Sequence, residues 1–322
     1  MPPGLRQWTG DTRATLSITH KLCIGWFAAN LLAATAVLAG ACHVLRLSSS
    51  ERAQRVARAL ARLCWRWPFA LCPWIRVTFA AGRDDLARLG IGSSVWLIAN
   101  HVSFLDTVLF AAFVPPTTLA RFQCLADARL FKLPLLGTVL KACGNIPVYF
   151  AKPESSGFST DKARSEETAA RLEASVGRGG SIAVYPEGQM NRADATSLQP
   201  FRHGGFRVPL RHDMAIYAWV AAGNAECWPR NVAIGGMPAD IRVALLPVAP
   251  AGTRSFLREA LLSGRASDDD GEAAAAVSVL CAARSDDAEV AEAVARGAPA
   301  LSRLCQTVMQ DALTALNSDR AQ

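Results

Sequence analysis

One histidine and one aspartate, His101 and Asp106, stand where a strand-like apolar run (95–99) gives way to a helix-like one (108–114). Side chains at such a turn project from the rim of a sheet, and residues five apart can face each other across about one and a half helical turns. An aspartate that accepts the imidazole Nδ1–H leaves Nε2 unprotonated. That is the arrangement of a general base for deprotonating an alcohol.

The same pair is also compatible with a purely structural contact, since a histidine beside an aspartate often has no chemical role. Ser103, which lies between the two, could be a hydrolase nucleophile, but no Gly-x-Ser-x-Gly elbow surrounds it. We therefore expect Ser103 to be a turn residue, and the choice between catalysis and structure depends on the segments around the pair.

Five ordered segments resemble those of the glycerolipid acyltransferases, the family that includes 1-acylglycerol-3-phosphate and other lysophospholipid acyltransferases. Asn100-His101-x4-Asp106 resembles the first family motif, and Tyr185-Pro186-Glu187-Gly188 resembles the Pro-Glu-Gly motif that the family has further along the chain. The remaining matches are 130–137, 144–148 and 200–206, the last with the pattern Phe-x-x-Gly-x-Phe.

The resemblance implies an enzyme that moves a fatty acyl group from acyl-CoA to the free hydroxyl of 1-acylglycerol-3-phosphate and so makes phosphatidic acid. His101 would be the general base, oriented by Asp106, and Glu187 and Gly188 would help to hold the acceptor lipid. The implied partners are a lysophospholipid acceptor, the acyl-CoA donor and membrane lipids. No metal and no cofactor is implied, because acyl-CoA is a co-substrate.

The chain departs from the family where phosphate is expected to bind. The family usually follows Pro-Glu-Gly with Thr-Arg-Ser, whereas Gln189-Met190-Asn191 stands here, and Phe150 replaces the arginine that usually ends the second motif. A phosphate still needs cations, because charge-assisted hydrogen bonds hold it. The candidates for this role are Arg192, Lys152, Arg202 and His203.

These departures leave the acceptor open. A second interpretation keeps the chemistry but gives it another lysophospholipid or glycerol-3-phosphate as acceptor. A third interpretation is a membrane-anchored lipid-binding protein without catalysis, and the intact His101 and Asp106 argue against it. Acyl-CoA and acyl carrier protein both stay open as the thioester donor.

Composition favours a membrane and phosphate as partners. The 322 residues are 51% hydrophobic, with a net charge of +7 and a mean hydropathy of +0.18, too apolar for a disordered protein. A basic excess also suits nucleic acid, but no nucleic-acid motif and no basic stripe interleaved with aromatics is present. None of the nine cysteines has Cys-x-x-Cys spacing, which favours small buried hydrophobes over a metal cluster.

Residues 1–70 are predicted to attach the protein to a membrane. Residues 22–44 contain no Asp, Glu, Lys or Arg, and a bilayer span needs about 20 apolar residues. A buried core helix and a signal peptide are the alternatives, and length does not separate a spanning helix from a monotopic one. The resemblance implies the endoplasmic reticulum or another internal membrane, and the basic flanks favour a catalytic domain that faces the cytosol.

Residues 51–67 are predicted to form an amphipathic helix that ends at Pro68 and Pro73. An arginine face opposite a Leu/Trp face is typical of a helix in the lipid headgroup layer, and the alternative is a surface helix with its apolar side on the core. The two faces comprise Arg55, Arg58, Arg62 and Arg66 against Val56, Leu60, Leu63 and Trp67.

Residues 71–322 are predicted to form the acyltransferase domain, with a C-terminal helical segment at 298–316. Strand-like and helix-like runs alternate from 75 to 185, and two later strands are expected at 215–222 and 241–248. This alternation predicts an α/β fold whose mostly parallel or mixed central sheet is flanked by helices and preceded by N-terminal membrane helices.

Overall fold

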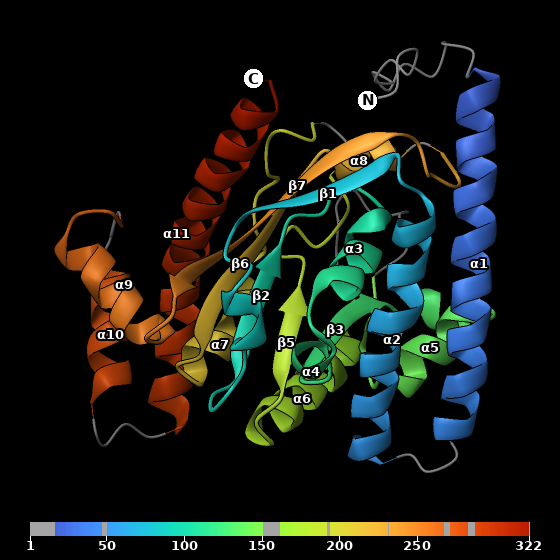
Figure 1. The fold of residues 1–322 in the computed structure, drawn as a ribbon. Helices are drawn as coiled ribbons and strands as arrows, with labels where there is room; N and C mark the ends of the chain where they lie inside the picture. The colour runs from blue at the N-terminus through green and yellow to red at the C-terminus, as the bar shows by residue number, and fades with distance from the viewer. Residues whose placement is uncertain are drawn as a thin grey trace.

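A seven-stranded sheet forms the centre of the protein, and helices cover both of its faces (Figure 1). The computed structural model describes residues 17–46, 50–150, 162–191, 194–230, 232–266, 271–282 and 287–321. The strands in chain order are β1 (Ile75–Ala81), β2 (Val95–Ala99), β3 (Phe122–Asp127), β4 (Ile146–Val148), β5 (Ser181–Val184), β6 (Ala215–Ala222) and β7 (Ala239–Ala249).

The strand order in the sheet is β1-β7-β6-β2-β5-β3-β4. The five strands from β6 to β4 run parallel, β7 is antiparallel to β6, and β1 is parallel to β7. The prediction of an α/β fold with a mostly parallel or mixed sheet is therefore confirmed. The strand predicted at 215–222 coincides with β6, and the one predicted at 241–248 lies within β7.

Two apolar cores lie on the two faces of the sheet, and β2 feeds both. All five residues of β2 are buried: Trp96 and Ile98 point to one core, and the alternate residues point to the other. The core that takes the alternate residues is covered by α1 (Ile18–Arg46), α2 (Glu51–Leu71), α3 (Leu105–Phe113), α4 (Pro116–Leu119) and α5 (Leu136–Ala142). The core around Trp96 is covered by α6 (Lys162–Gly177), α7 (Arg207–Arg211), α9 (Thr253–Leu262), α10 (Glu272–Cys281) and α11 (Asp287–Ala321).

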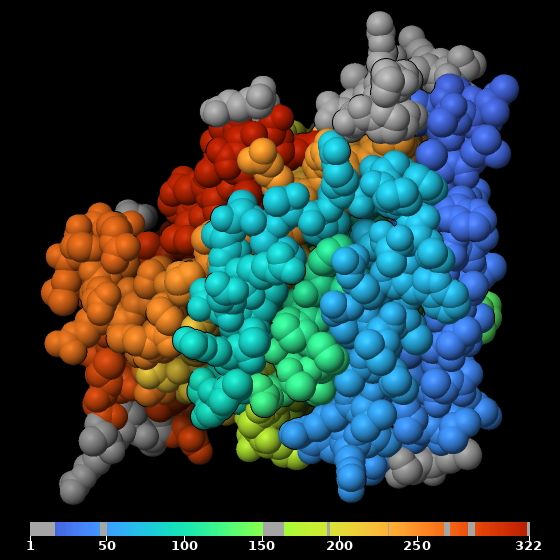
Figure 2. Space-filling view, viewed as in Figure 1, coloured from blue at the N-terminus to red at the C-terminus, as the bar shows by residue number. Residues whose placement is uncertain are grey.

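The N-terminal helices α1 and α2 pack side by side along one flank of the protein (Figure 2). Of the membrane helices expected there, one is found in the described chain: residues 18–45 are long and apolar enough to cross a membrane by length and composition. The helix α2 instead packs its own stripe of residues on the α/β body, with Ala57, Ala61, Trp65 and Phe69 buried.

The predicted end of α2 is wrong, and its arginine face is more buried than the sequence predicts. Pro68 lies inside the helix, which continues to Leu71. The arginine face is divided: Arg58 is buried and the Arg66 guanidinium lies 4.4 Å from the centre of the Phe113 ring, whereas the Arg55 side chain is 52% exposed. The reason is that α2 buries a third stripe, of small and aromatic residues. On the Leu/Trp face, Leu60 packs against the core while Leu63, which is 62% exposed, and Trp67 stay open to the surroundings.

Candidate active site

The turn after β2 is anchored by the side chain of Asn100. Its amide nitrogen donates to the carbonyl of Ala221 at 2.9 Å, and its amide oxygen accepts from the Ala221 N–H at 2.9 Å. Ala221 belongs to β6, the neighbour of β2 in the sheet. The side chain therefore continues the hydrogen bonding between the strands at the point where the backbone leaves β2, and it fixes where His101 begins.

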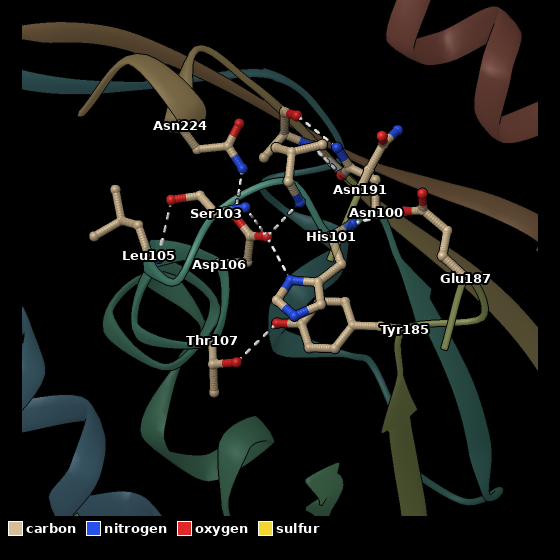
Figure 3. Close-up of polar contacts among 12 residues, drawn as sticks. Asn100, His101, Ser103, Leu105, Asp106, Thr107, Tyr185, Glu187, Asn191 and Asn224 are labelled. Atoms are coloured by element: carbon tan, nitrogen blue, oxygen red, sulfur yellow. Dashed lines mark hydrogen bonds and ion pairs between the residues drawn. The ribbon is translucent and has the colours of Figure 1, made fainter. Parts of the chain in front are cut away.

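The structure brings His101 and Asp106 together, with 2.8 Å between Nδ1 and Oδ2 (Figure 3). The same Oδ2 accepts from the backbone N–H groups of Val102 and Ser103, both at 2.9 Å. The other oxygen accepts from the amide of Asn224, the first residue of α8 (Asn224–Cys227). Since a carboxylate only accepts, Nδ1 carries the proton, and four donors fix the carboxylate that holds it.

The imidazole is only partly buried, and one of its nitrogens has no partner in the described part of the chain. The His101 side chain is 21% exposed, whereas that of Asp106 is 4% exposed, and Nε2 makes no hydrogen bond within the described part of the chain. The ring stacks on Tyr185, with 4.2 Å between the ring centres. Burial raises the pKa of the Tyr185 phenol well above its usual value. Tyr185 therefore stays neutral and packs against the imidazole, and it does not act as a second base.

Ser103 is bound on both sides of its hydroxyl. Its Oγ donates to the carbonyl of Trp228 at 2.7 Å and accepts from the N–H of Leu105 at 3.1 Å. The residue is fully buried. The hydroxyl therefore shapes the turn into α3 and does not point toward the imidazole as a nucleophile would.

Glu187 lies against the backbone of the histidine turn. Its Oε1 accepts from the N–H of His101 and its Oε2 from the N–H of Gln199, both at 2.9 Å, and the side chain is buried. Burial raises the pKa of the Glu187 carboxyl, and the two backbone N–H groups offset part of that rise. The turn itself depends on Gly188, whose φ of 74° favours glycine and whose N–H returns to the carbonyl of Tyr185.

Of the four residues predicted to bind phosphate, the structure describes two, Arg202 and His203. Lys152 and Arg192 lie outside the described residues. The backbone N–H of Arg202 donates to the carbonyl of Pro186 at 2.8 Å. The backbone of Arg202 and His203 therefore lies beside the Glu187 turn, and both side chains are exposed.

Sequence reasoning missed Arg230, a further cation at this site. Its guanidinium donates to the carbonyl of Asn191 at 3.2 Å, and the N–H of Asn191 donates to the carbonyl of His101 at 2.6 Å. Arg230 and Asn224 both come from the connection between β6 and β7, outside every motif. The sequence has no pattern that singles out these two residues, because the connection comes near the end of β2 only in the folded protein.

We predict that Glu187→Gln destabilises the protein by about 1–3 kcal/mol, because the new amide nitrogen faces one of two buried N–H donors and leaves it unpaired. Because the folded-state pKa of Glu187 is raised, the folded protein binds more protons just above the unfolded value. The contribution of Glu187 to the free energy of unfolding therefore falls as pH rises from its unfolded-state pKa to its folded-state pKa. Over this range the difference in stability between the unmodified protein and the Glu187→Gln variant should become smaller.

Guanidinium unfolding of the detergent-solubilised protein across that pH range measures both effects. The control is Glu167→Gln, which alters an exposed glutamate paired with Arg171 on α6 and should change stability little. Equal stability of the Glu187→Gln variant and the unmodified protein would show that the two backbone contacts contribute nothing.

Two comparisons with known proteins found similarity to this chain. The protein-family model described as Acyltransferase matches residues 81–221, the part of the chain that carries β2 through β6 and the whole histidine–aspartate turn. No curated protein matches the sequence.

A solved structure, the 1-acyl-sn-glycerophosphate (LPA) acyltransferase PlsC from Thermotoga maritima, aligns with 93% of this chain and 97% of its own. The TM-score is 0.59 and the sequence identity is 13%, so this likeness shows the fold. Taken together, the two comparisons show that residues 81–221 are similar to the Acyltransferase family model and that the chain shares the fold of this acyltransferase structure.

Proposed function

We propose that the protein transfers a fatty acyl group from acyl-CoA to the free hydroxyl of 1-acylglycerol-3-phosphate and produces phosphatidic acid. The observation that carries the proposal is the partly exposed imidazole of His101, whose Nδ1 is bound to Asp106 at 2.8 Å while its Nε2 makes no hydrogen bond in the described part of the chain. Support for the acceptor comes from the related fold of an LPA acyltransferase and from the cations beside the turn.

The reaction needs one base and no covalent enzyme intermediate. Nε2 of His101 takes the proton of the acceptor hydroxyl as its oxygen forms a bond to the thioester carbonyl carbon. Asp106 stabilises the imidazolium that results. The C–S bond then breaks, and the departing thiolate takes the proton back, which leaves His101 neutral for the next cycle.

The direct test is an assay of the purified protein in detergent, with lysophosphatidic acid and oleoyl-CoA as substrates and free thiol as the readout. We expect His101→Ala to lower the rate by about 10²–10⁴-fold, the contribution of a positioned base. His212→Ala is the matched control, because His212 pairs with Glu173 on the surface and should leave the rate unchanged. Full activity of the His101→Ala variant would rule out the proposed mechanism.

Another acceptor remains a second candidate, and Met190 is the observation that favours it. The family usually has an arginine at that position to bind phosphate, and a thioether gives no charge-assisted hydrogen bond. Arg230 is the cation that we propose in its place for 1-acylglycerol-3-phosphate, because it already contacts the backbone that follows the glutamate turn.

We predict that Arg230→Gln raises the KM for lysophosphatidic acid by about 10–100-fold, since a hydrogen bond to a charged group contributes about 1.5–3 kcal/mol. The KM for oleoyl-CoA should change less. Arg207→Gln, which alters an exposed arginine of α7, is the matched control. A panel that includes glycerol-3-phosphate and other lysophospholipids identifies the acceptor; an unchanged KM for all phosphate-bearing acceptors would exclude Arg230 from the binding site.

We also propose that residues 1–70 attach the enzyme to an internal membrane such as the endoplasmic reticulum, with residues 71–322 as the catalytic domain on the cytosolic side. Support comes from the apolar side chains that α1 and α2 leave exposed together. They are Ile18, Leu22, Trp26, Leu32, Val37 and Val44 on α1, and Val56, Leu63, Trp67 and Leu71 on α2.

The double variant Leu63→Glu/Trp67→Glu should reduce sedimentation with phospholipid vesicles after detergent removal, because it places two charges on the proposed lipid-facing side of α2. Leu262→Glu is the control: Leu262 is 80% exposed on α9, which covers the other face of the sheet. Equal vesicle binding by both variants would argue that α2 lies outside the lipid contact.

A further inference from the structure

A cavity of about 110 Å³ lies at the end of the molecule opposite the histidine turn. The start of α2, the residue before β3 and the end of α6 line it. β3 and β5 begin at this end and run parallel to β2, whose far end leads into His101 (Figure 1). The cavity is therefore separated from the site described above by the length of the sheet.

Four arginines line this cavity, and one carboxylate accompanies them. They are Arg55, Arg58, Arg121 and Arg178, with Glu51 as the carboxylate. Glu51 is already paired, because its Oε1 lies 2.8 Å from a guanidinium nitrogen of Arg55. Three guanidinium groups therefore remain without an anionic partner among the cavity's described lining residues.

The positive charge is not only at the surface. Arg58 is 5% exposed, and its Nε is buried without a hydrogen-bond partner in the described structure. The Nη1 of Arg121 is buried and unpartnered in the same way. Burial lowers the pKa of the Arg58 guanidinium, and the neighbouring charge of Arg55 lowers it further.

A buried cation without a partner is among the more costly arrangements in a protein, and an anion brought between like charges removes most of that cost. Guanidinium groups bind oxyanions through paired N–H donors, which suits phosphate in particular. The cavity is smaller than the roughly 300–1,000 Å³ of sites that take whole drug-sized molecules. Its size and charge therefore fit a headgroup-sized anion.

We propose that this cavity binds a phosphate-class oxyanion, held by Arg58, Arg121 and Arg178, which ties α2 to the α/β body. The anion's oxygens accept from α2 through Arg58, from the start of β3 through Arg121 and from the end of α6 through Arg178. The source is either free phosphate or the phosphate of a membrane lipid, since α2 also presents Leu63 and Trp67 to the surroundings.

The test follows the melting temperature of the full chain in nonionic detergent while sodium phosphate replaces sodium chloride at constant ionic strength. A ligand that binds only the folded state raises the melting temperature in a saturable way. We expect such a rise in the unmodified protein and its loss in Arg178→Gln, whose exposed side chain is not needed for folding. Arg207→Gln and Arg230→Gln should keep the rise, which separates this cavity from an ordinary surface charge and from the histidine site.

Arg58→Met gives an independent readout. In chloride this variant should melt no lower than the unmodified protein, because it removes an unpaired buried charge, and it should not respond to phosphate. Glu51→Gln should respond at lower phosphate concentration, because it frees Arg55 for the anion.

A second arm replaces detergent with vesicles, either of phosphatidylcholine alone or with one quarter phosphatidic acid. A rise in melting temperature that requires phosphatidic acid and Arg178 identifies the lipid as the source, and one that occurs with inorganic phosphate identifies the free anion. If neither arm gives a rise that depends on Arg178, the proposal is wrong.

Discussion

The active site depends on how one short turn is held. Four donors converge on the carboxylate of Asp106: the imidazole of His101, two backbone N–H groups of the same turn, and the amide of Asn224. A carboxylate with this many donors cannot rotate away from the imidazole without leaving buried polar groups unpaired. The orientation of Nε2 is therefore a consequence of backbone geometry, and the chemistry proposed for this nitrogen needs no adjustment when the substrate arrives.

The order of strands in the sheet explains why two distant motifs act on the same turn. Parallel strands place their C-terminal ends along one edge, and β2 lies directly between β6 and β5. From one side, β5 delivers Glu187 to the backbone N–H of His101. From the other side, β6 delivers Ala221 to Asn100 and leads into the connection that carries Asn224. The turn is thus held by both neighbours of its own strand.

The sequence was sufficient for the fold class and for the contact between His101 and Asp106, because both depend on local patterns: apolar runs of strand length and a fixed spacing at a turn. It was insufficient for contacts made through the backbone, such as that of Glu187, since backbone groups leave no mark in a sequence. It was also insufficient for α2, where the arginine and leucine faces were visible but the third, buried stripe of Ala57, Ala61 and Trp65 decided the orientation. Asn224 and Arg230 could not be found because only the fold brings their connection to β2.

The residues that orient His101 and the cations that are proposed to bind phosphate differ in burial, and this difference affects how the site can change. The groups that orient the imidazole are buried and bonded to one another through Asp106, so altering one of them leaves another polar group unpaired and costs stability. Arg202 and Arg230, by contrast, are exposed and lie outside the helices and strands, where an arginine can be lost at one position and supplied from another at little cost. Met190 follows the hydrogen-bonded turn of Glu187, and Arg230 reaches the same backbone from a different connection, which fits that expectation. Acceptor choice can therefore vary in such a fold while the base and its aspartate stay unchanged.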